Sequence, residues 1–322
     1  MNDWMKEEMS YIRLLGNPQN KETERELVIL LPVGCYWAKK NKPCSYCGYQ
    51  PVVNGFHDKY GEVDYVDILK NEVGKQELPF QRITFFVGGS FLEIPPQKQI
   101  EIFEYVDTLT ITDVFIESRP ELIREENIAA LKNCLHNKDL MVAIGLESSK
   151  EEIRNEIHEK GILNKTYFKA MDVLKNLEVK SLVYVFVKPP VANITDKEAY
   201  EEAMDTIKFA FETGAYAVEI ESGYIVENSR MYDLYIENQY QVLNLWTIFK
   251  LLQDAIKLDM GLCRLAYFSD TPEPIAIPKS CEKCTDKLYE TLDKYRKTLD
   301  SKYIYEIKEC DCKKDWNTMF NE

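Results

Sequence analysis

Three cysteines follow a short apolar run, and their type and spacing indicate a metal site. Cys35, Cys44 and Cys47 are spaced C-x8-C-x2-C and come directly after residues 26–31, which predict a buried strand. Four protein ligands complete a tetrahedral zinc site or a fully ligated iron–sulfur cube, so three leave one position open. The pattern therefore predicts a [4Fe–4S] cluster with one iron available to an exogenous ligand. The alternative is a zinc site that takes His57 as its fourth ligand.

Four further cysteines stand near the end of the chain as two close pairs. Cys281 and Cys284 form a C-x2-C pair, and Cys310 and Cys312 form a C-x-C pair. Two such pairs joined by a helical spacer, here residues 288–299, are typical of a structural zinc site with four thiolate ligands. A second iron–sulfur cluster needs the same number of ligands and is the open alternative.

The composition of the chain limits the cell compartment in which the protein works and the partners that it can bind. The chain has 322 residues, nine cysteines and a formal net charge of −14. No apolar run approaches the ~20 residues that span a bilayer, and the acidic, amphipathic start does not resemble a secretory signal. We therefore expect a cytoplasmic protein with no membrane partner, whose cysteines serve metal or redox chemistry rather than disulfides. A nucleic-acid substrate would require a local basic patch, such as Lys39, Lys40 and Lys42, or a partner protein.

Apolar strands and amphipathic helices alternate through the middle of the chain. Six buried strands are expected over residues 27–31, 83–87, 114–117, 141–146, 182–187 and 217–220, with a further short strand within 262–268. Such strands predict an α/β fold with a parallel sheet covered by helices. We expect a partial (β/α)6 TIM-like barrel over residues 26–270, preceded by an N-terminal helical segment (1–25) and followed by a small cysteine-rich, metal-binding extension (271–322). A doubly wound sheet is the alternative fold.

Polar residues follow several of these strands, where such barrels carry their chemistry. Lys188, between a buried strand and two prolines, and Glu221 are the candidate catalytic residues. Glu147 ends an otherwise apolar strand, which indicates a ligand contact rather than a structural role. Arg154 in the next helix can hold a carboxylate bidentately, although a solvated position is the alternative. The other candidate ligand-binding residues are Tyr46, Gly88, Gly89, Ser90, Glu117 and Arg119.

Several segments together resemble the radical S-adenosylmethionine (SAM) superfamily. Within it they resemble the archaeosine-forming group, which is related to the radical SAM domain of the elongator catalytic subunit. The segments are GCYWAKKNKPCSYCGY, FFVGGSFLE, ESRPELI, GLESS, VKPP, CEKC and a terminal CDC followed by Trp316. The usual cysteine pattern of the superfamily is C-x3-C-x-aromatic-C. Tyr46 supplies the aromatic residue here, and the first gap is five residues longer than usual.

The resemblance implies a cofactor, a set of roles and a substrate. It implies that Cys35, Cys44 and Cys47 hold a [4Fe–4S] cluster whose fourth iron binds SAM. It also implies that residues 88–90 contact the methionine amino group of SAM, and that Glu117 and Arg119 meet its ribose or carboxylate. A flavodoxin- or ferredoxin-type donor supplies the electron, and the radical formed from SAM removes a hydrogen atom from the substrate.

Members of the group act on a lysine-bearing 7-deazaguanine in tRNA, left by a partner synthase, and are thought to break the lysine C–N bond so that an amidine remains. Two other functions stay open from the residues alone. One is a radical SAM enzyme that modifies a peptide or a small metabolite. The other is a non-catalytic zinc-binding adaptor.

Overall fold

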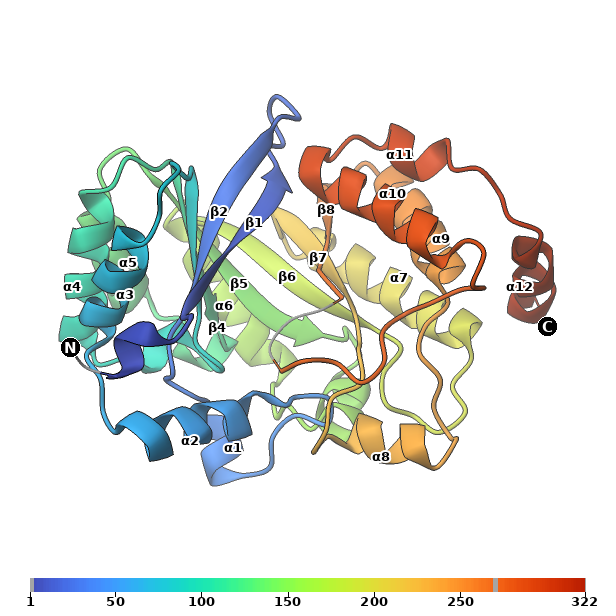
Figure 1. Ribbon diagram of the computed structural model, residues 1–322, viewed down its shortest axis with the longest axis horizontal. Coiled ribbons are helices and arrows are strands. Elements are labelled where there is room, and N and C mark those ends of the chain that lie inside the picture. Colours follow the sequence, from blue (N-terminus) through green and yellow to red (C-terminus); the bar gives the residue numbers. More distant parts are fainter. Residues whose placement is uncertain (1–2, 269–271, 322) are drawn as a thin grey trace.

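Eight strands form one sheet in which each strand lies beside the next one in the chain (Figure 1). The computed structural model describes residues 3–268 and 272–321. β1 pairs with β2 in the antiparallel direction, and every later pair is parallel. The strands are β1 Ser10–Gly16, β2 Thr23–Leu30, β3 Arg82–Phe86, β4 Asp113–Ser118, β5 Asp139–Glu147, β6 Lys180–Val187, β7 Ala217–Ser222 and β8 Leu262–Leu265.

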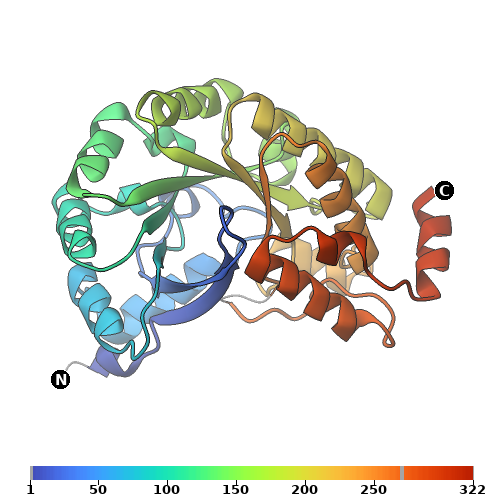
Figure 2. The same ribbon diagram turned by 90° about the horizontal axis from the view of Figure 1, so that it is seen from above.

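Helices cover the outer, convex face of this curled sheet (Figure 2). α1, α2 and α8 lie instead at the end where the parallel strands terminate, at the bottom of Figure 1. The helices are α1 Tyr36–Lys40, α2 Tyr49–Tyr60, α3 Tyr65–Gly74, α4 Pro96–Asp107, α5 Glu125–Cys134, α6 Asn164–Asn176, α7 Asp196–Glu212, α8 Arg230–Ile236, α9 Leu245–Lys257, α10 Thr285–Thr298, α11 Lys302–Tyr305 and α12 Cys312–Asn321. The expected partial (β/α) barrel is confirmed, and no described helix is both long and apolar enough to cross a membrane.

The two faces of the sheet differ because side chains alternate along each strand. On β7, Val218 and Ile220 are fully buried in the large core between sheet and helices. Ala217 instead belongs to a small inner cluster with Phe115, Ala143 and Leu182, which fills the barrel below the strand ends. Glu219 and Glu221 follow Ala217 at intervals of two residues, so the sequence AVEIES places both carboxylates above this apolar floor.

The N-terminal segment differs from its expected structure. Residues 1–25 were expected to be helical, but residues 10–16 form β1, which pairs with β2 over seven positions from Ser10 opposite Ile29 to Gly16 opposite Thr23. In the described part of the chain before β1, from residue 3 onward, a short 3-10 turn, Asp3–Lys6, is the helical element. The segment YIRLL adopts the extended form because one face packs into the barrel while its backbone completes the ladder of β2.

α10 from the C-terminal extension packs against both edges of the curled sheet. The Tyr267 hydroxyl donates to the carbonyl oxygen of Leu14 at 3.0 Å, which links the segment after β8 to β1. Arg296 of α10 donates to the carbonyl oxygens of Leu265 and Ala266, and its guanidinium lies over the Tyr267 ring. The gap between β1 and β8 is thus covered by α10, beside the blue strands in Figure 2.

Candidate active site

One cavity of about 250 Å³ opens at the C-terminal ends of the parallel strands. It receives residues from six strand ends and from the cysteine loop, as expected for a barrel of this type. Ten of the residues singled out in the sequence line it: Cys35, Cys44, Tyr46, Cys47, Gly88, Gly89, Glu117, Arg119, Glu147 and Glu221.

The cysteine loop is held against the glycine turn after β3. A Cβ atom on Gly89 would lie 2.2 Å from the carbonyl oxygen of Gly34, so only glycine permits this contact. The Cys35 N–H donates to Gln50 Oε1 at 3.1 Å, and the Cys47 N–H donates to the carbonyl oxygen of Cys44 at 2.9 Å. The role of Gly89 that the structure supports is therefore to hold the cysteine loop in place.

Desolvation raises the pKa of Cys44, and raises that of Cys47 to about 12. Lys160 and Arg119 act in the opposite direction on Cys44, because their positive charges favour its thiolate. Thiolates are the form that binds metal, so occupation of this site releases protons and depends on these two cations.

Two observations argue against a zinc site at Cys35, Cys44 and Cys47. Among the described residues, only the tail cysteines gather their sulfur atoms within 4.8 Å of one another, so the three head thiols are spread more widely. The proposed fourth ligand, His57, has Nε2 2.6 Å from the carbonyl oxygen of Pro32 and Nδ1 3.1 Å from that of Gly61. Both of its ring nitrogens are therefore already engaged by the backbone.

Glu147 forms a buried network with a lysine that the sequence analysis missed. Lys160 Nζ donates to Glu147 Oε1 at 2.8 Å and to the Tyr46 hydroxyl at 3.0 Å, while that hydroxyl donates to Glu147 Oε1 at 2.9 Å. A bulge between Gly145 and Glu147 interrupts the pairing of β5 with β6, and Glu147 has φ +67°. Bulges and left-handed residues of this kind re-aim side chains at functional sites.

Arg119 joins the cysteine loop to the segment after β5. Its guanidinium lies 4.8 Å from the Trp37 ring and donates to the carbonyl oxygen of Lys160 at 2.5 Å. The Trp37 indole N–H donates to the carbonyl oxygen of Glu159 at 2.9 Å. A Cβ atom on Gly161 would lie 1.9 Å from the Trp37 ring, so the indole packs directly on the glycine backbone.

Three of the residues predicted to bind SAM or the substrate, Arg154, Lys188 and Ser90, are not among those that line the cavity. Arg154 is fully buried, and its guanidinium donates to the carbonyl oxygens of Ser148, Ser149 and Ile162 and to Asn164 Oδ1. These bonds occupy the donors that a cofactor carboxylate would need. The structure therefore gives Arg154 a structural role in place of the expected contact with SAM.

Lys188 and Ser90 are also placed differently from expectation. Lys188 Nζ pairs with Asp196 Oδ1 at 2.7 Å, and the residue lines a separate hollow beside α12 rather than the cavity. Ser90 is fully buried and is not among the residues that line the cavity, and its hydroxyl accepts the backbone N–H of Arg119 at 2.9 Å. The expected substrate contact of Lys188 is therefore not supported by the geometry.

Several residues of the cavity carry little signal in the sequence. Tyr184 and Phe186 belong to a strand that reads as continuously apolar, LVYVFV, so nothing marks them as inward-facing. Lys160 follows Glu159 in a loop, where a solvated side chain is the usual outcome. The one available signal was its neighbour Gly161, since a glycine beside a charged residue can mark a close packing contact.

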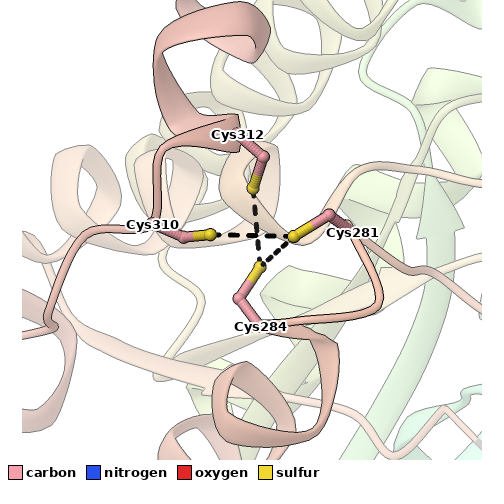
Figure 3. Close-up of side chains that lie close together, drawn as sticks. All are labelled: Cys281, Cys284, Cys310 and Cys312. Carbon is pink, nitrogen blue, oxygen red and sulfur yellow. Dashed lines mark hydrogen bonds between the residues drawn. The ribbon is translucent and has the colours of Figure 1, made fainter.

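The four tail cysteines form a second site between α10 and α12 (Figure 3). Cys281 Sγ lies 3.4 Å from Cys284 Sγ and 3.6 Å from Cys310 Sγ, and Cys284 Sγ lies 3.5 Å from Cys312 Sγ. The neighbouring thiols lower the pKa of Cys281 to about 7. The indole N–H of Trp246 donates to Cys312 Sγ at 3.4 Å, as expected for a partner that orients a metal ligand.

Comparison with known proteins gives consistent matches over most of the chain. A family model described as the Radical SAM superfamily matches residues 31–204, more than half of the chain. The archaeosine synthase subunit beta of Methanosarcina acetivorans is 25% identical over 312 residues, which cover 92% of this chain and 85% of that protein. The subunit of the same name from Thermococcus kodakarensis is 25% identical over 323 residues, covering 96% and 95%.

A solved structure shares the fold. It is Elp3 of the archaeon Methanocaldococcus infernus with an N-terminal deletion, and it matches with a TM-score of 0.54 at 15% identity. The matched region covers 74% of this chain and 60% of that one.

Proposed function

The chain belongs to the radical SAM superfamily, and on that premise we propose that it removes a hydrogen atom from a modified base of tRNA. The observation that carries the proposal is the convergence of Cys35, Cys44 and Cys47 on the same cavity as the Glu147–Lys160 pair. The radical SAM fold implies a [4Fe–4S] cluster and SAM. When bound, these supply one-electron cleavage of SAM and a carbon radical that removes hydrogen from the substrate.

The residues of the chain fit these cofactors. Three thiols open onto the cavity, which matches a cluster that leaves one iron to SAM. Lys160 and Arg119 provide positive charge beside Cys44, which favours the thiolate and is complementary to the carboxylate of SAM. Gly145 leaves room for Lys160, because a Cβ atom there would lie 2.7 Å from its Nζ atom.

In this proposal each group of the cavity has a physical role. The cluster is bound by Cys35, Cys44 and Cys47. Lys160 holds the carboxylate of SAM, and Tyr46 and Glu147 fix the position of the Lys160 ammonium group through their hydrogen bonds to it. Phe86 and Phe186 line the cavity and exclude water from the reacting atoms. An external flavodoxin- or ferredoxin-type protein supplies the electron.

The substrate we propose is the lysine-bearing 7-deazaguanine of tRNA, whose lysine C–N bond is broken to leave an amidine. The support is that relatives named archaeosine synthase subunit beta align over more than nine-tenths of this chain. The exposed Lys40 and Lys42 stand beside the cysteine loop, where they can contact phosphate groups despite the net charge of −14. A partner synthase that presents the modified tRNA would supply the remaining basic surface.

The test is an anaerobic assay with reconstituted protein, SAM, dithionite and tRNA that carries the lysine-modified base, followed by mass spectrometry of the nucleosides. A transcript with unmodified guanine at the same position is the matched control. Conversion of the modified base alone supports the proposal. Formation of 5′-deoxyadenosine without any change in the tRNA would refute this substrate and favour a peptide or a small metabolite.

We further propose that the tail cysteines bind one Zn²⁺ ion. Zinc–sulfur bonds of ~2.3 Å in a tetrahedron separate the sulfur atoms by ~3.8 Å, and the closest thiol pairs here lie at 3.4–3.6 Å. A four-iron cluster would hold each thiolate on a different iron and therefore farther apart. The spacing thus supports a single ion over a second cluster.

A further inference from the structure

A second hollow, of about 640 Å³, lies next to the cavity at the same end of the barrel. Phe186 of β6 lines the cavity, and Lys188, two residues later, lines the hollow. On α8, Met231 lines the cavity and Tyr235, about one turn later, lines the hollow. Two residues of extended chain span at most about 7 Å. A large ligand whose reacting part enters the cavity is therefore within reach of the hollow.

A buried lysine ammonium in the hollow has more donors than acceptors. Lys188 is 4% exposed and lines the hollow. Its Nζ atom donates to Asp196 Oδ1 at 2.7 Å and lies 5.7 Å from the centre of the Tyr240 ring. Within residues 3–268 and 272–321, Asp196 is the one hydrogen-bond partner of this ammonium group. An ammonium group has three N–H donors, so two remain for a ligand.

The charge of Asp196 is already shared among several donors. Its Oδ2 atom accepts the Asn244 N–H at 3.0 Å and the Thr247 hydroxyl at 2.7 Å. Asp196 is the one carboxylate among the described residues that line the hollow, whereas two lysines, Lys188 and Lys279, line it. Lys279 is exposed, so its ammonium group is accessible from solvent. The lining of the hollow therefore carries a net positive charge in a chain whose net charge is −14.

The starts of two helices add to this positive potential. The residues that cap the amino ends of α7 and α9, Thr195 and Asn244, both line the hollow. The amino end of a helix carries about half an elementary positive charge, which favours an anion. Asp196, the first residue of α7, uses part of this potential, and the two lysines remain to balance a further anion. The hollow thus favours a ligand with a negative charge.

We propose that this hollow binds a phosphate group of the RNA backbone through Lys188 and Lys279. Phosphate oxygens accept hydrogen bonds from lysine ammonium groups, and such contacts position a protein on a nucleic acid. α12 contributes apolar side chains, among them the exposed Met319, against which a ribose or a base can pack. The inference rests on the proposed function, because it takes RNA as the substrate. The contact expected of Lys188 in the cavity is thus replaced by a contact with the RNA backbone in the hollow.

The experiment measures the binding of a fluorescein-labelled tRNA transcript to the reconstituted holoenzyme by fluorescence anisotropy, between about 0.05 and 0.2 M salt. Lys279→Gln should lower the affinity about threefold and make the dependence of log K on log salt concentration shallower by about one, as the loss of one phosphate contact does. Lys208→Gln removes the same charge at an exposed position on α7 and should change neither quantity. Formation of 5′-deoxyadenosine without RNA should stay at the wild-type level in both variants, because neither residue lines the cavity.

Lys188→Gln removes the buried ammonium group and should weaken tRNA binding at least as much as Lys279→Gln, with the fold checked by circular dichroism. The exposed position of Lys279 keeps the test valid even where Lys188→Gln is unstable.

Wild-type affinity and salt dependence in Lys279→Gln would overturn the proposal, as would the absence of tRNA binding by the wild type. Saturable binding of inorganic phosphate that Lys279→Gln weakens, with tRNA affinity unchanged, would assign the hollow to a free anion and overturn the RNA assignment. Binding of tRNA that depends on Lys279, without conversion of the lysine-modified base, would refute the proposed reaction and leave the RNA site standing.

Discussion

At the scale of single residues, His158 packs against Tyr46 of the cysteine loop and helps to hold that loop in place. Its ring is fully buried and packs edge-on against Tyr46 at 5.3 Å and Phe186 at 5.1 Å. Neither ring nitrogen has a hydrogen-bond partner within residues 3–268 and 272–321. Burial, with the positive charges of Lys160 and Arg154, lowers the pKa of His158 to about 3. The ring therefore acts as a neutral spacer under Tyr46.

This burial predicts a specific loss of stability in acid. Below the usual pKa of 6.5 the unfolded chain binds a proton at His158 while the folded protein does not, so protonation favours unfolding as the pH falls toward about 3. Between pH 7 and pH 5 the wild type should lose about 2 kcal/mol of unfolding free energy more than His158→Leu. Urea denaturation at the two pH values measures the difference. Identical slopes for the wild type and His158→Leu would contradict the account.

At the scale of the elements, α1 and the segment after β5 form one unit through Trp37 and Gly161. The indole ring of Trp37 occupies the space that a side chain at Gly161 would need, and Gly161 has φ +63°. The Arg119 guanidinium lies 4.8 Å from the same indole ring. Because α1 follows Cys35 directly, this packing sets the position of the cysteine loop. The cofactor site thus depends on contacts outside the cavity.

A pair of glycine variants separates this packing from backbone strain. Gly61 has a similar φ of +68°, but no neighbouring atom lies within 4 Å of the position that a Cβ atom would take there. Gly61 has ψ −156°, a backbone conformation that is essentially limited to glycine, so Gly61→Ala should cost only this backbone strain of about 1–3 kcal/mol. Gly161→Ala adds a clash with Trp37 at 1.9 Å and should cost clearly more, with a loss of bound iron after reconstitution. Denaturant unfolding and iron analysis test both variants. Equal effects on stability and iron would mean that the Trp37 contact is unimportant.

Local patterns predicted the elements well and the side-chain partners less well. The apolar runs located β2 to β8, because parallel strands buried on both faces are continuously apolar. β1 was missed because the edge segment SYIRLLG has mixed polarity, and only pairing with β2 makes it a strand. Arg154 and Lys188 were expected at the cavity but do not line it. The sequence pattern indicates how far a residue lies from a strand end, but not the direction in which its side chain points.

At the scale of the whole molecule, the C-terminal extension is joined to the barrel at two places. α10 covers the gap between β1 and β8, and α12 is held through Trp316, whose indole N–H donates to Thr247 of α9 at 2.9 Å. The cysteine site lies between these helices, and Ser280, directly before Cys281, donates to Asn244 Oδ1 at the start of α9. A metal ion there would connect the extension to a helix of the barrel.

Removal of one tail cysteine should therefore affect metal content and stability rather than the cluster. Cys281→Ser is expected to lower bound zinc from one ion per chain to near zero and the melting temperature by about 5 °C or more. Iron content after reconstitution should stay unchanged. Cys134→Ser, at a cysteine far from both sites in the sequence, is the control and should keep zinc. Retention of zinc by Cys281→Ser, or an iron loss equal to the zinc loss, would contradict the separate roles of the two sites.

The central claim is that Cys35, Cys44 and Cys47 hold a cluster that cleaves SAM, and one measurement tests it most directly. Anaerobically reconstituted wild type and Cys44→Ala are analysed for iron and sulfide, and for 5′-deoxyadenosine after addition of SAM and dithionite. The account predicts about four irons and 5′-deoxyadenosine in the wild type, and loss of the product in Cys44→Ala with the fold retained by circular dichroism. Wild-type levels of 5′-deoxyadenosine in Cys44→Ala, or a wild type that binds only zinc and leaves SAM intact, would contradict it.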